Sequence, residues 1–412
     1  MTFNSFEYPN ELEKIFEKLN SHNLKAIIVG GFVRDFFLSK SSKDIDIEIY
    51  GLSNIDELIK LLKEFGKVYE VGKSFGVCKL ELKYLDLDFS MPRIDNKTSS
   101  GHRGFIVETK RELDFKTASS RRDFTINSIG YDTKIKIILD PYDGLKDLKN
   151  LSLKIVDKKS FIEDPLRVFR AMSMVARFEL QVEAQTLELC HEMVKNKLLE
   201  ELAKERIFEE FKKLFLKSQQ ISFGLEFLKN IGIESFFPEL NFEKKIFEET
   251  LCSMNAYQTN KTNDDKTNIK LLLVLLCYSF QTNEVDSFLV KLSNKKNFSR
   301  EIKILINDAK LLKENQDTYT LKKCATSSKL SELCLLLDAQ GVDTSKISKE
   351  AQELGILNTS IPMLITGKDL LKAKLLPSRE FSKILLQTYE AQLNSKFTTK
   401  DEALIWIHKY IL

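Results

Sequence analysis

The chain has 412 residues, which is too long for one ordinary hydrophobic core and predicts about two to four domains. Hydrophobic residues make up 43% and charged residues 30% of the sequence, a composition that excludes a disordered chain. The formal net charge is only +3, so a surface that binds nucleic acid would have to be local.

The beginning of the chain and its most apolar run both argue against a membrane protein. Residues 1–16 contain no apolar segment and no cleavage site of the kind found in secretory signals. The run IKLLLVLLCYSF, residues 269–280, is too short to cross a bilayer and predicts a buried helix. The six cysteines are scattered without a CxxC pair, so neither a disulfide framework nor a zinc site is expected. These features predict a cytoplasmic protein without membrane contact.

The apolar periodicity divides the chain near residue 150. Ten of the fifteen glycines lie at or before Gly144, in a part where short strand-like alternations recur. Beyond residue 150 the apolar period becomes that of a helix. The expected fold class is therefore α+β, with an N-terminal α/β head followed by an all-helical neck, body and tail. The expected domains are 1–150 (head), 151–240 (neck), 241–330 (body) and 331–412 (tail).

The first candidate site lies in IIVGGFVRDFFLSKSSKDIDIEIYG, residues 27–51. Gly30 and Gly31 end an expected strand and begin an expected helix, where backbone N–H groups can approach an anion. Asp44, Asp46 and Glu48 follow at period 2 and so share one face of a strand. Like charges this close repel, so positive groups should lie against that face. Carboxylates beside an anion-binding turn suit a Mg²⁺–triphosphate complex, whereas the alternatives are a solvated strand face and a tight turn without ligand.

A third carboxylate is expected from YLDLDFSMPR, residues 84–93. Asp86 and Asp88 again stand at period 2 and share one strand face. Asp88 is the better candidate of the two, because Arg93 follows shortly and suits phosphate binding. The alternative for this pair is an exposed strand face.

The spacing of these residues resembles that of a known superfamily. Two glycines, twelve residues and then Asp-x-Asp form the signature of the nucleotidyltransferases, which include DNA polymerase β. The fuller string resembles the class II tRNA nucleotidyltransferases (CCA-adding enzymes) and the bacterial poly(A) polymerases. The third motif of that family usually reads Gly-Gly where this chain has Asp143 and Gly144. In family order, the further matching segments are RRDFTINSIGYD (121–132), DPYDGLKDL (140–148), EDPLRVFRAMSMVARF (163–178) and ERIFEEF (205–211).

The resemblance implies roles for individual residues. It implies that Asp44 and Asp46 hold Mg²⁺ and that Asp88 is a further catalytic residue, which accepts the proton of the attacking hydroxyl. In RRDFTIN, two guanidinium groups suit a triphosphate, and Asp123 is expected to accept a ribose hydroxyl. The alternative is a structural ion pair between Arg122 and Asp123. The implied nucleotide-binding residues are Gly30, Gly31, Arg34, Arg121, Arg122, Asp123, Asn127, Asp164, Arg167 and Arg170.

The segment EDPLR allows a local and a functional interpretation. Pro165 is expected at the first position of a helix, which would make Asp164 its N-cap. Asp164 and Arg167 are also three residues apart, so they share a helix face and place acceptors beside donors. Such a pair matches the amino group and ring nitrogen of cytosine and adenine and opposes the carbonyl of uracil and guanine. The family resemblance implies the same role, with Glu163 and Arg170 bracing the pair.

Two longer segments refine the expected activity. The polar segment 92–120 resembles the loop with which the family switches to the addition of A, and enzymes that add only CC lack it. Many longer bacterial members carry an HD phosphohydrolase domain after the neck, but none of the four histidines here stands beside an aspartate. The body, 241–330, is therefore expected to be a degenerate HD-like region without phosphatase activity.

These motifs predict a template-independent nucleotidyltransferase that builds the 3′-terminal CCA of tRNA from CTP and ATP and releases pyrophosphate. Its expected cofactor is Mg²⁺, and its expected partner is the acceptor arm and 3′ end of tRNA, held by the helical body and tail. The sequence does not fix the oligomeric state. The alternatives are an A-adding or CC-adding specialist, a poly(A) polymerase and a catalytically inactive RNA-binding protein. Poly(A) polymerases usually have a basic string after the Asp-x-Asp strand and a long basic tail, which this chain lacks.

Overall fold

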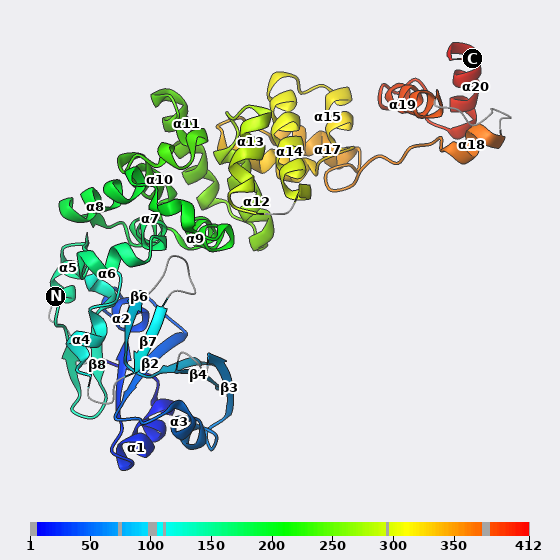
Figure 1. The fold of residues 1–412 in the computed structure, drawn as a ribbon. Coiled ribbons are helices and arrows are strands. Elements are labelled where there is room, and N and C mark those ends of the chain that lie inside the picture. The colour runs from blue at the N-terminus through cyan, green and yellow to red at the C-terminus, as the bar shows by residue number, and fades with distance from the viewer. Residues whose placement is uncertain are drawn as a thin grey trace. The chain divides into compact units, whose positions relative to one another are not determined.

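The chain folds into two compact units, Met1–Asn241 and Phe242–Leu412. The computed structural model describes residues 6–72, 76–97, 105–109, 113–293, 296–372 and 380–411. The first unit holds a mixed β-sheet with helices, and the described part of the second consists of helices and their connections (Figure 1). The predicted α+β fold class is therefore confirmed. The finer division into head, neck, body and tail stays a prediction.

A seven-stranded sheet underlies the first unit, with the strand order β3-β4-β5-β2-β1-β8-β9. β2 and β5 run parallel, and the other neighbouring strands of this sheet run antiparallel. A separate antiparallel hairpin pairs β6 with β7 inside the polar segment 92–120, and β10 pairs with β11. The strands are β1 (Lys25–Val29), β2 (Asp44–Tyr50), β3 (Lys67–Gly72), β4 (Val77–Glu81), β5 (Asp86–Ser90), β6 (Arg93–Lys97), β7 (Phe105–Thr109), β8 (Gly130–Asp132), β9 (Ile137–Leu139), β10 (Ser152–Leu153) and β11 (Gln181–Val182).

The central strand β2 has two different faces. Ile45, Ile47 and Ile49 are buried in the core of the unit. Asp44 and Asp46 are exposed on the opposite face, as the period-2 pattern predicts. The strand therefore presents these carboxylates at the surface of the sheet.

Five helices accompany the sheet, and α2 follows β1 directly. α1 packs against β1 and α3, and α2 packs against both β1 and β2. Asp143, just before α5, has a φ of 59°, the left-handed region that glycine adopts without strain. That conformation explains why the resembled family usually has glycine there. These helices are α1 (Glu13–Ser21), α2 (Gly31–Phe37), α3 (Ile55–Leu62), α4 (Phe115–Ser119) and α5 (Gly144–Lys149).

The rest of the first unit is a group of helices centred on α7. α7 packs against α9 and α10, and these helices lie together in green in Figure 1. The buried rings of Phe169, Phe211 and Phe237 meet there, with centroids 6.0–6.2 Å apart. This aromatic packing holds α7 against α9 and against the segment that follows α10. The helices are α6 (Lys158–Glu163), α7 (Leu166–Phe178), α8 (Ala184–Lys195), α9 (Lys204–Lys217) and α10 (Ile221–Asn230).

The second unit is built from ten described helices. Residues 271–276 of α12 are buried, which confirms the prediction of a buried helix for the most apolar run. Thr399 and Glu402 form a capping box at the start of α20. Within the described ranges, none of the helices has both the length and the apolar character that a membrane span requires. The helices are α11 (Lys244–Thr259), α12 (Asp265–Leu276), α13 (Thr282–Val290), α14 (Lys296–Glu314), α15 (Thr318–Cys324), α16 (Leu330–Ala339), α17 (Ser345–Glu353), α18 (Gly367–Lys372), α19 (Glu380–Leu393) and α20 (Lys400–Tyr410).

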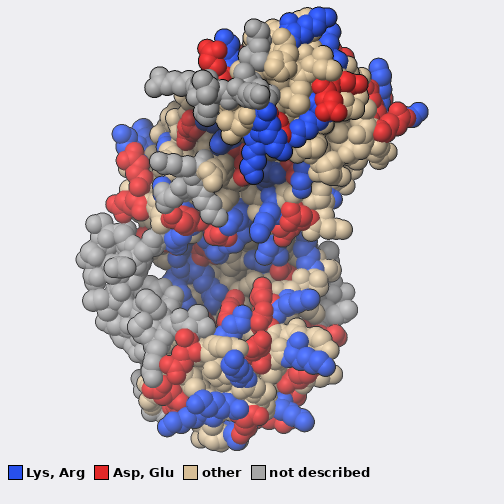
Figure 2. All heavy atoms as spheres, turned by 90° about the vertical axis from the view of Figure 1, so that its right-hand side faces the viewer, with Lys and Arg blue, Asp and Glu red and all other residues tan. Residues whose placement is uncertain are grey.

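Charge is mixed over the face drawn in Figure 2. Lys and Arg side chains (blue) and Asp and Glu side chains (red) alternate across it, without a broad area of one sign. This mixture agrees with the net charge of +3. A binding site for an anion must therefore be sought in particular cavities.

Candidate active site

A cavity of about 390 Å³ lies in the first unit, where the β1–α2 turn meets α7 and α9. All ten residues expected to bind the nucleotide line this cavity. Asp46, Leu166 and Arg206 complete its lining. Six of the thirteen lining residues are arginines, so the cavity is suited to a highly charged anion such as a triphosphate.

The turn between β1 and α2 forms one wall of the cavity. Gly30 has a φ of +71°, and a Cβ atom there would lie only 2.9 Å from a guanidinium nitrogen of Arg122. The backbone conformation therefore favours glycine strongly, and the absence of a Cβ leaves room for the guanidinium of Arg122. α2 begins at Gly31, as the sequence predicts.

The aspartates predicted on β2 and β5 share one face of the sheet. β2 and β5 pair in register, with Asp46 opposite Asp88 and Asp44 opposite Asp86. The carboxylate of Asp46 is accessible from the cavity, but the surrounding atoms remove part of its solvent, and this desolvation raises its pKa. Arg122 lowers the pKa of Asp46, and the neighbouring carboxylates Asp88 and Asp44 raise it. The net pKa of Asp46 is raised. Negative charge is therefore concentrated at this point, and a cation bound there would relieve the repulsion.

The arrangement of these oxygens can be compared with the needs of a metal ion. Among the residues that the structure describes, no three His, Cys, Asp or Glu side chains converge into a ready-made metal cage. Mg²⁺ does not require such a cage, because it is usually held by one or two carboxylates together with substrate phosphates and water. Asp46 beside the arginine-lined cavity, with Asp44 two residues away on the same strand face, fits that requirement.

The positive charge expected beside the acidic strand comes from two consecutive arginines. Glu48, only 1% exposed, accepts hydrogen bonds from Arg122 at 2.7 Å, Arg121 at 3.5 Å and the Tyr50 hydroxyl at 2.9 Å. Burial would raise the pKa of Glu48, but Arg122 and Arg121 outweigh this effect and lower it. Glu48 thus holds two arginines at the cavity, a role that the sequence did not assign to it.

Replacing Glu48 with Gln should destabilise the protein by about 3 kcal/mol, because two partly buried guanidinium groups lose their negative partner. The measurement is urea unfolding of the wild type and the variant. The pKa of Glu48 is lowered in the folded protein. The difference in unfolding free energy between wild type and variant should therefore have its full size above about pH 4.3, the ordinary pKa of Glu, and should shrink below that pH. The exposed Glu64, which pairs with Lys18, provides the control, and Glu64→Gln should be nearly neutral. Equal stability of Glu48→Gln and wild type at pH 7 would contradict the assigned role.

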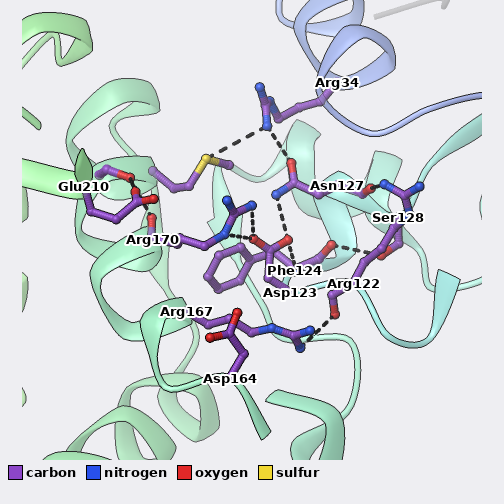
Figure 3. A network of polar contacts seen from close by, with 12 residues as sticks. Arg34, Arg122, Asp123, Phe124, Asn127, Ser128, Asp164, Arg167, Arg170 and Glu210 are labelled. Carbon is purple, nitrogen blue, oxygen red and sulfur yellow. Dashed lines mark hydrogen bonds and ion pairs between the residues drawn. The ribbon is translucent and has the colours of Figure 1, made fainter. Parts of the chain in front are cut away.

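A buried polar network forms the floor of the cavity (Figure 3). Asp123, 6% exposed, accepts hydrogen bonds from Arg170 Nε at 2.7 Å and from the Asn127 amide at 2.9 Å. The Asn127 oxygen accepts a hydrogen bond of 2.5 Å from Arg34. Burial would raise the pKa of Asp123, but Arg170 and Asn127 outweigh it and lower this pKa to about 2. The alternative ion pair between Arg122 and Asp123 is therefore wrong, because Arg122 pairs with Glu48 and Asp123 with Arg170.

The N-cap interpretation of Asp164 is also wrong. The residue at the N-cap of α7 is Pro165, and no side chain caps this helix. Asp164 has the extended backbone conformation that N-cap residues usually adopt, but α7 has no side-chain cap, so the conformation alone does not make its carboxylate a cap. It lines the cavity and faces Arg206 on α9 at 3.4 Å.

Arg167 lies on the same side of the cavity as Asp164, as their spacing predicts. Its guanidinium donates to the backbone carbonyls of Arg121 and Arg122 and to the Ser160 hydroxyl. The base-selecting pair of the sequence interpretation is therefore brought together at one wall, with donors and acceptors both present.

Sequence reasoning did not place Glu48 and Arg206 in the site. Arg206 stands in ERIFEEF, a segment that matches a family motif. The motif thus indicated that this segment matters, although no role was assigned to Arg206. Glu48 was noted only as one of three acidic residues on a strand. Asp88 belongs to the acidic face, but it does not line the arginine-rich cavity. The side chains of residues 93–97 and all of residues 98–104 lie outside what the structure describes.

A mixed sheet that carries an Asp-x-Asp strand, beside a Gly-Gly turn and an arginine-lined cavity, is the site expected of a nucleotidyltransferase. Comparisons with protein families agree. Residues 26–154 match the poly A polymerase head domain, residues 179–243 a probable RNA- and SrmB-binding site of polymerase A, and residues 233–407 a putative tRNA nucleotidyltransferase domain 2. The chain belongs to the class II CCA-adding enzyme and poly(A) polymerase family.

Individual relatives show how far the similarity extends. The multifunctional CCA protein of Xylella fastidiosa (strain M12) is 34% identical over 222 residues, which are 53% of this chain and 51% of that protein. This chain thus matches about half the length of that relative. The CCA-adding enzyme of Lactococcus lactis subsp. cremoris (strain MG1363) is 28% identical over 409 residues, which are 96% of this chain and 94% of the enzyme. The Thermotoga maritima CCA-adding enzyme complexed with tRNA has a similar fold, with a TM-score of 0.69 and 20% identity over 98% of this chain and 97% of that one.

Proposed function

We propose that the protein adds CCA to the 3′ end of tRNA from CTP and ATP without a nucleic-acid template. The observation that carries this proposal is the convergence of the Gly-Gly turn, Asp46, six arginines and Asp164 on one cavity. The similarity to the Lactococcus CCA-adding enzyme over almost the full length of both chains supports it. The proposed partners are tRNA, CTP and ATP.

The roles of the residues follow from their positions in the cavity. Arg121 and Arg122, held by Glu48, bind the triphosphate, and the first N–H groups of α2 bind its oxygens. The Gly30 N–H itself donates to the Ile129 carbonyl at 3.2 Å. Asp44 and Asp46 would hold Mg²⁺, which would offset the negative charge of the triphosphate. Asp123 supports the ribose side of the cavity, although its oxygens already accept bonds from Arg170 and Asn127.

The reaction then needs a nucleophile and a place for its proton. The 3′-hydroxyl oxygen of the tRNA forms a bond to the α-phosphorus of the nucleotide while the bond to pyrophosphate breaks. Asp88 lies opposite Asp46 on the acidic face and is the proposed acceptor of the hydroxyl proton. Burial is the main cause of its raised pKa, which makes its carboxylate a better base than an ordinary aspartate.

Base selection is proposed for Asp164 and Arg167. The Asp164 carboxylate accepts hydrogen bonds and the Arg167 guanidinium donates them, and both line the same cavity. This combination complements the amino group and adjacent ring nitrogen of cytosine and of adenine. Because neither residue belongs to a nucleic acid, the choice requires no template.

A single assay tests the proposed function. Purified protein is incubated with Mg²⁺ and tRNA that lacks its CCA end, with CTP alone, ATP alone or both, and products are resolved at single-nucleotide resolution. CTP alone should yield addition of two C residues, and both nucleotides together should yield CCA. Products that stop at CC when both nucleotides are present would identify a CC-adding specialist. Addition of A to a tRNA that already ends in CC, without any addition to tRNA that lacks the CCA end, would identify an A-adding specialist. Long A tails would identify a poly(A) polymerase. The absence of any product would favour a catalytically inactive RNA-binding protein.

Shortening the segment of residues 96–105 should leave the addition of C largely intact and greatly reduce the final addition of A. The reason is the likeness of this polar segment to the loop with which the family switches to A; residues 98–104 lie outside the described ranges. The rates of C and A addition are to be measured on one preparation, so that each controls for the other. An equal loss of both would indicate a structural role for the segment.

A further inference from the structure

A second cavity in the first unit adjoins the catalytic strand. Its volume is about 510 Å³, and we call it the basic groove. It is formed by the connection between α2 and β2 and by the C-terminal ends of α7 and α9. Its lining residues are Lys40, Ser41, Ser42, Lys43, Asp44, Arg177, Lys217 and Gln219.

Positive charge in the basic groove exceeds negative charge. Four of the eight lining residues are cationic and only Asp44 is anionic. Lys43 and Lys217 are exposed, and among the described residues neither lies within ion-pair distance of a carboxylate. Lys40 points to the Arg177 carbonyl at 3.5 Å and not to an acid. Uncompensated charge of this density suits an anionic ligand.

One side of the basic groove is held in place by an aromatic ring. The guanidinium groups of Arg34 and Arg177 and the ammonium group of Lys40 lie 4.5, 4.6 and 5.2 Å from the ring centre of Phe178. A single carboxylate, Asp35, 2% exposed, bonds both arginines, at 2.6 Å to Arg34 and 3.1 Å to Arg177. Three cations thus surround one ring and one buried anion, and net positive charge is built into this wall.

Helix stabilisation explains only part of this charge. Arg177 and Lys217 stand in the last turns of α7 and α9, where cations interact favourably with the helix dipole. Lys40 also donates to the Arg177 carbonyl in the last turn of α7, so among the described contacts only Lys43, in the connection between α2 and β2, has no share in either helix end. A ligand that binds several cations at once accounts for all four.

The position of the basic groove identifies that ligand. Asp44 and Asp46 are two residues apart on β2, yet Asp44 lines the basic groove and Asp46 lines the arginine-lined cavity, called the nucleotide cavity below. In phosphoryl transfer the attacking and leaving oxygens lie roughly in line on opposite sides of the phosphorus. With the triphosphate in the arginine-lined cavity, a strand seated in the basic groove would reach the α-phosphorus from the side of Asp44.

We infer that the basic groove binds the last phosphodiester groups of the RNA strand that is being extended. This inference rests on the proposed function, and it assigns Lys40, Lys217 and Arg177 as positioning residues for the RNA. The flexible lysines act as point charges on the backbone, so the groove would accept successive 3′ ends irrespective of the base just added.

The test is the double variant Lys40→Ala/Lys217→Ala, compared with wild type as full-length protein. The dissociation constant for tRNA lacking its CCA end should rise about tenfold or more without nucleotide present. Two lost phosphate contacts on a single strand should also reduce the slope of log affinity against log salt by about 1.4. The dissociation constant for CTP alone should stay within twofold. The matched control, Lys149→Ala/Lys195→Ala, removes two exposed lysines of the same unit that do not line the groove.

Each other outcome is decisive. Wild-type affinity for tRNA in the double variant, or an equal loss in the control, would overturn the inference. Weaker binding of CTP as well as tRNA would assign the groove to the nucleotide and overturn it too. If the alanine variant does not fold, Lys40→Gln/Lys217→Gln removes the charges and keeps the side-chain length. Absence of C and A addition by the wild type would refute the proposed function, whereas the tRNA-binding comparison would still decide on the groove.

Discussion

Asp44→Ala and Asp46→Ala should each abolish the addition of both C and A, by roughly a thousandfold or more. Both reactions would depend on the same cation held by these two carboxylates, and its loss would remove several kcal/mol of transition-state stabilisation. The measurement is single-turnover transfer of each nucleotide to tRNA, ending in the discriminator base for C and in CC for A. Asp46 should also be needed for tight binding of the Mg²⁺–CTP complex, because it lines the nucleotide cavity.

Asp86 provides the matched control for this prediction. It lies opposite Asp44 in the strand register and pairs with Lys79 at 3.2 Å, but it lines neither the nucleotide cavity nor the basic groove. Asp86→Ala should therefore retain transfer within a few fold of wild type. Near wild-type addition of A by either the Asp44 or the Asp46 variant would disprove the metal assignment.

Asp164→Asn should change which nucleotide is accepted. The substitution replaces a charged acceptor by an amide that can also donate, so the O4 of uracil or the O6 of guanine can be received. A changed base-edge hydrogen bond corresponds to about 1–3 kcal/mol, or roughly tenfold to a hundredfold in selectivity. The expected result is lower kcat/KM for CTP and ATP with measurable use of UTP or GTP, read in the same transfer assay. Arg167→Ala should cause a broader loss, because Arg167 also donates to two backbone carbonyls near the triphosphate.

A true helix cap nearby serves as the control for Asp164. The Asp157 carboxylate accepts a hydrogen bond of 2.7 Å from the Ser160 N–H at the start of α6. Asn caps helices about as well as Asp, so Asp157→Asn should be silent in nucleotide choice and in thermal stability. Asp164→Asn should likewise keep the thermal stability of the wild type, since Asp164 caps no helix. Wild-type nucleotide preference in Asp164→Asn would remove it from the base-selecting site.

Local patterns predicted much of this molecule. Alternation over residues 44–50 gives the strand and its two faces, and the glycine pair marks the strand–helix turn. The cavity lining was also named in advance, because short motifs carry the positions that a ligand touches. The partners within the cavity were not predicted. Glu48 and Arg122 are 74 residues apart in the sequence, and no local pattern encodes such a contact.

The error at Asp164 has a different physical origin. Asp before Pro is a good local signal for an N-cap, but it describes one helix in isolation. Here α6 ends immediately before this residue, and Arg206 from α9 lies beside the carboxylate. A tertiary ion pair thus replaces the local hydrogen bond that the sequence suggests. The same competition explains Asp123, whose buried charge is bound by Arg170 on α7 and not by its neighbour in sequence.

The bond between Asp123 and Arg170 limits how the chain can be recombined. A fragment that ended near residue 150 would retain a deeply enclosed carboxylate and lose the guanidinium that compensates it. Arg167 would likewise no longer hold the two carbonyls of residues 121 and 122. A chimera that exchanges the catalytic sheet between relatives should therefore include α7 from the same relative. The sheet and this helix have to be exchanged together, because each supplies one partner of the buried ion pair.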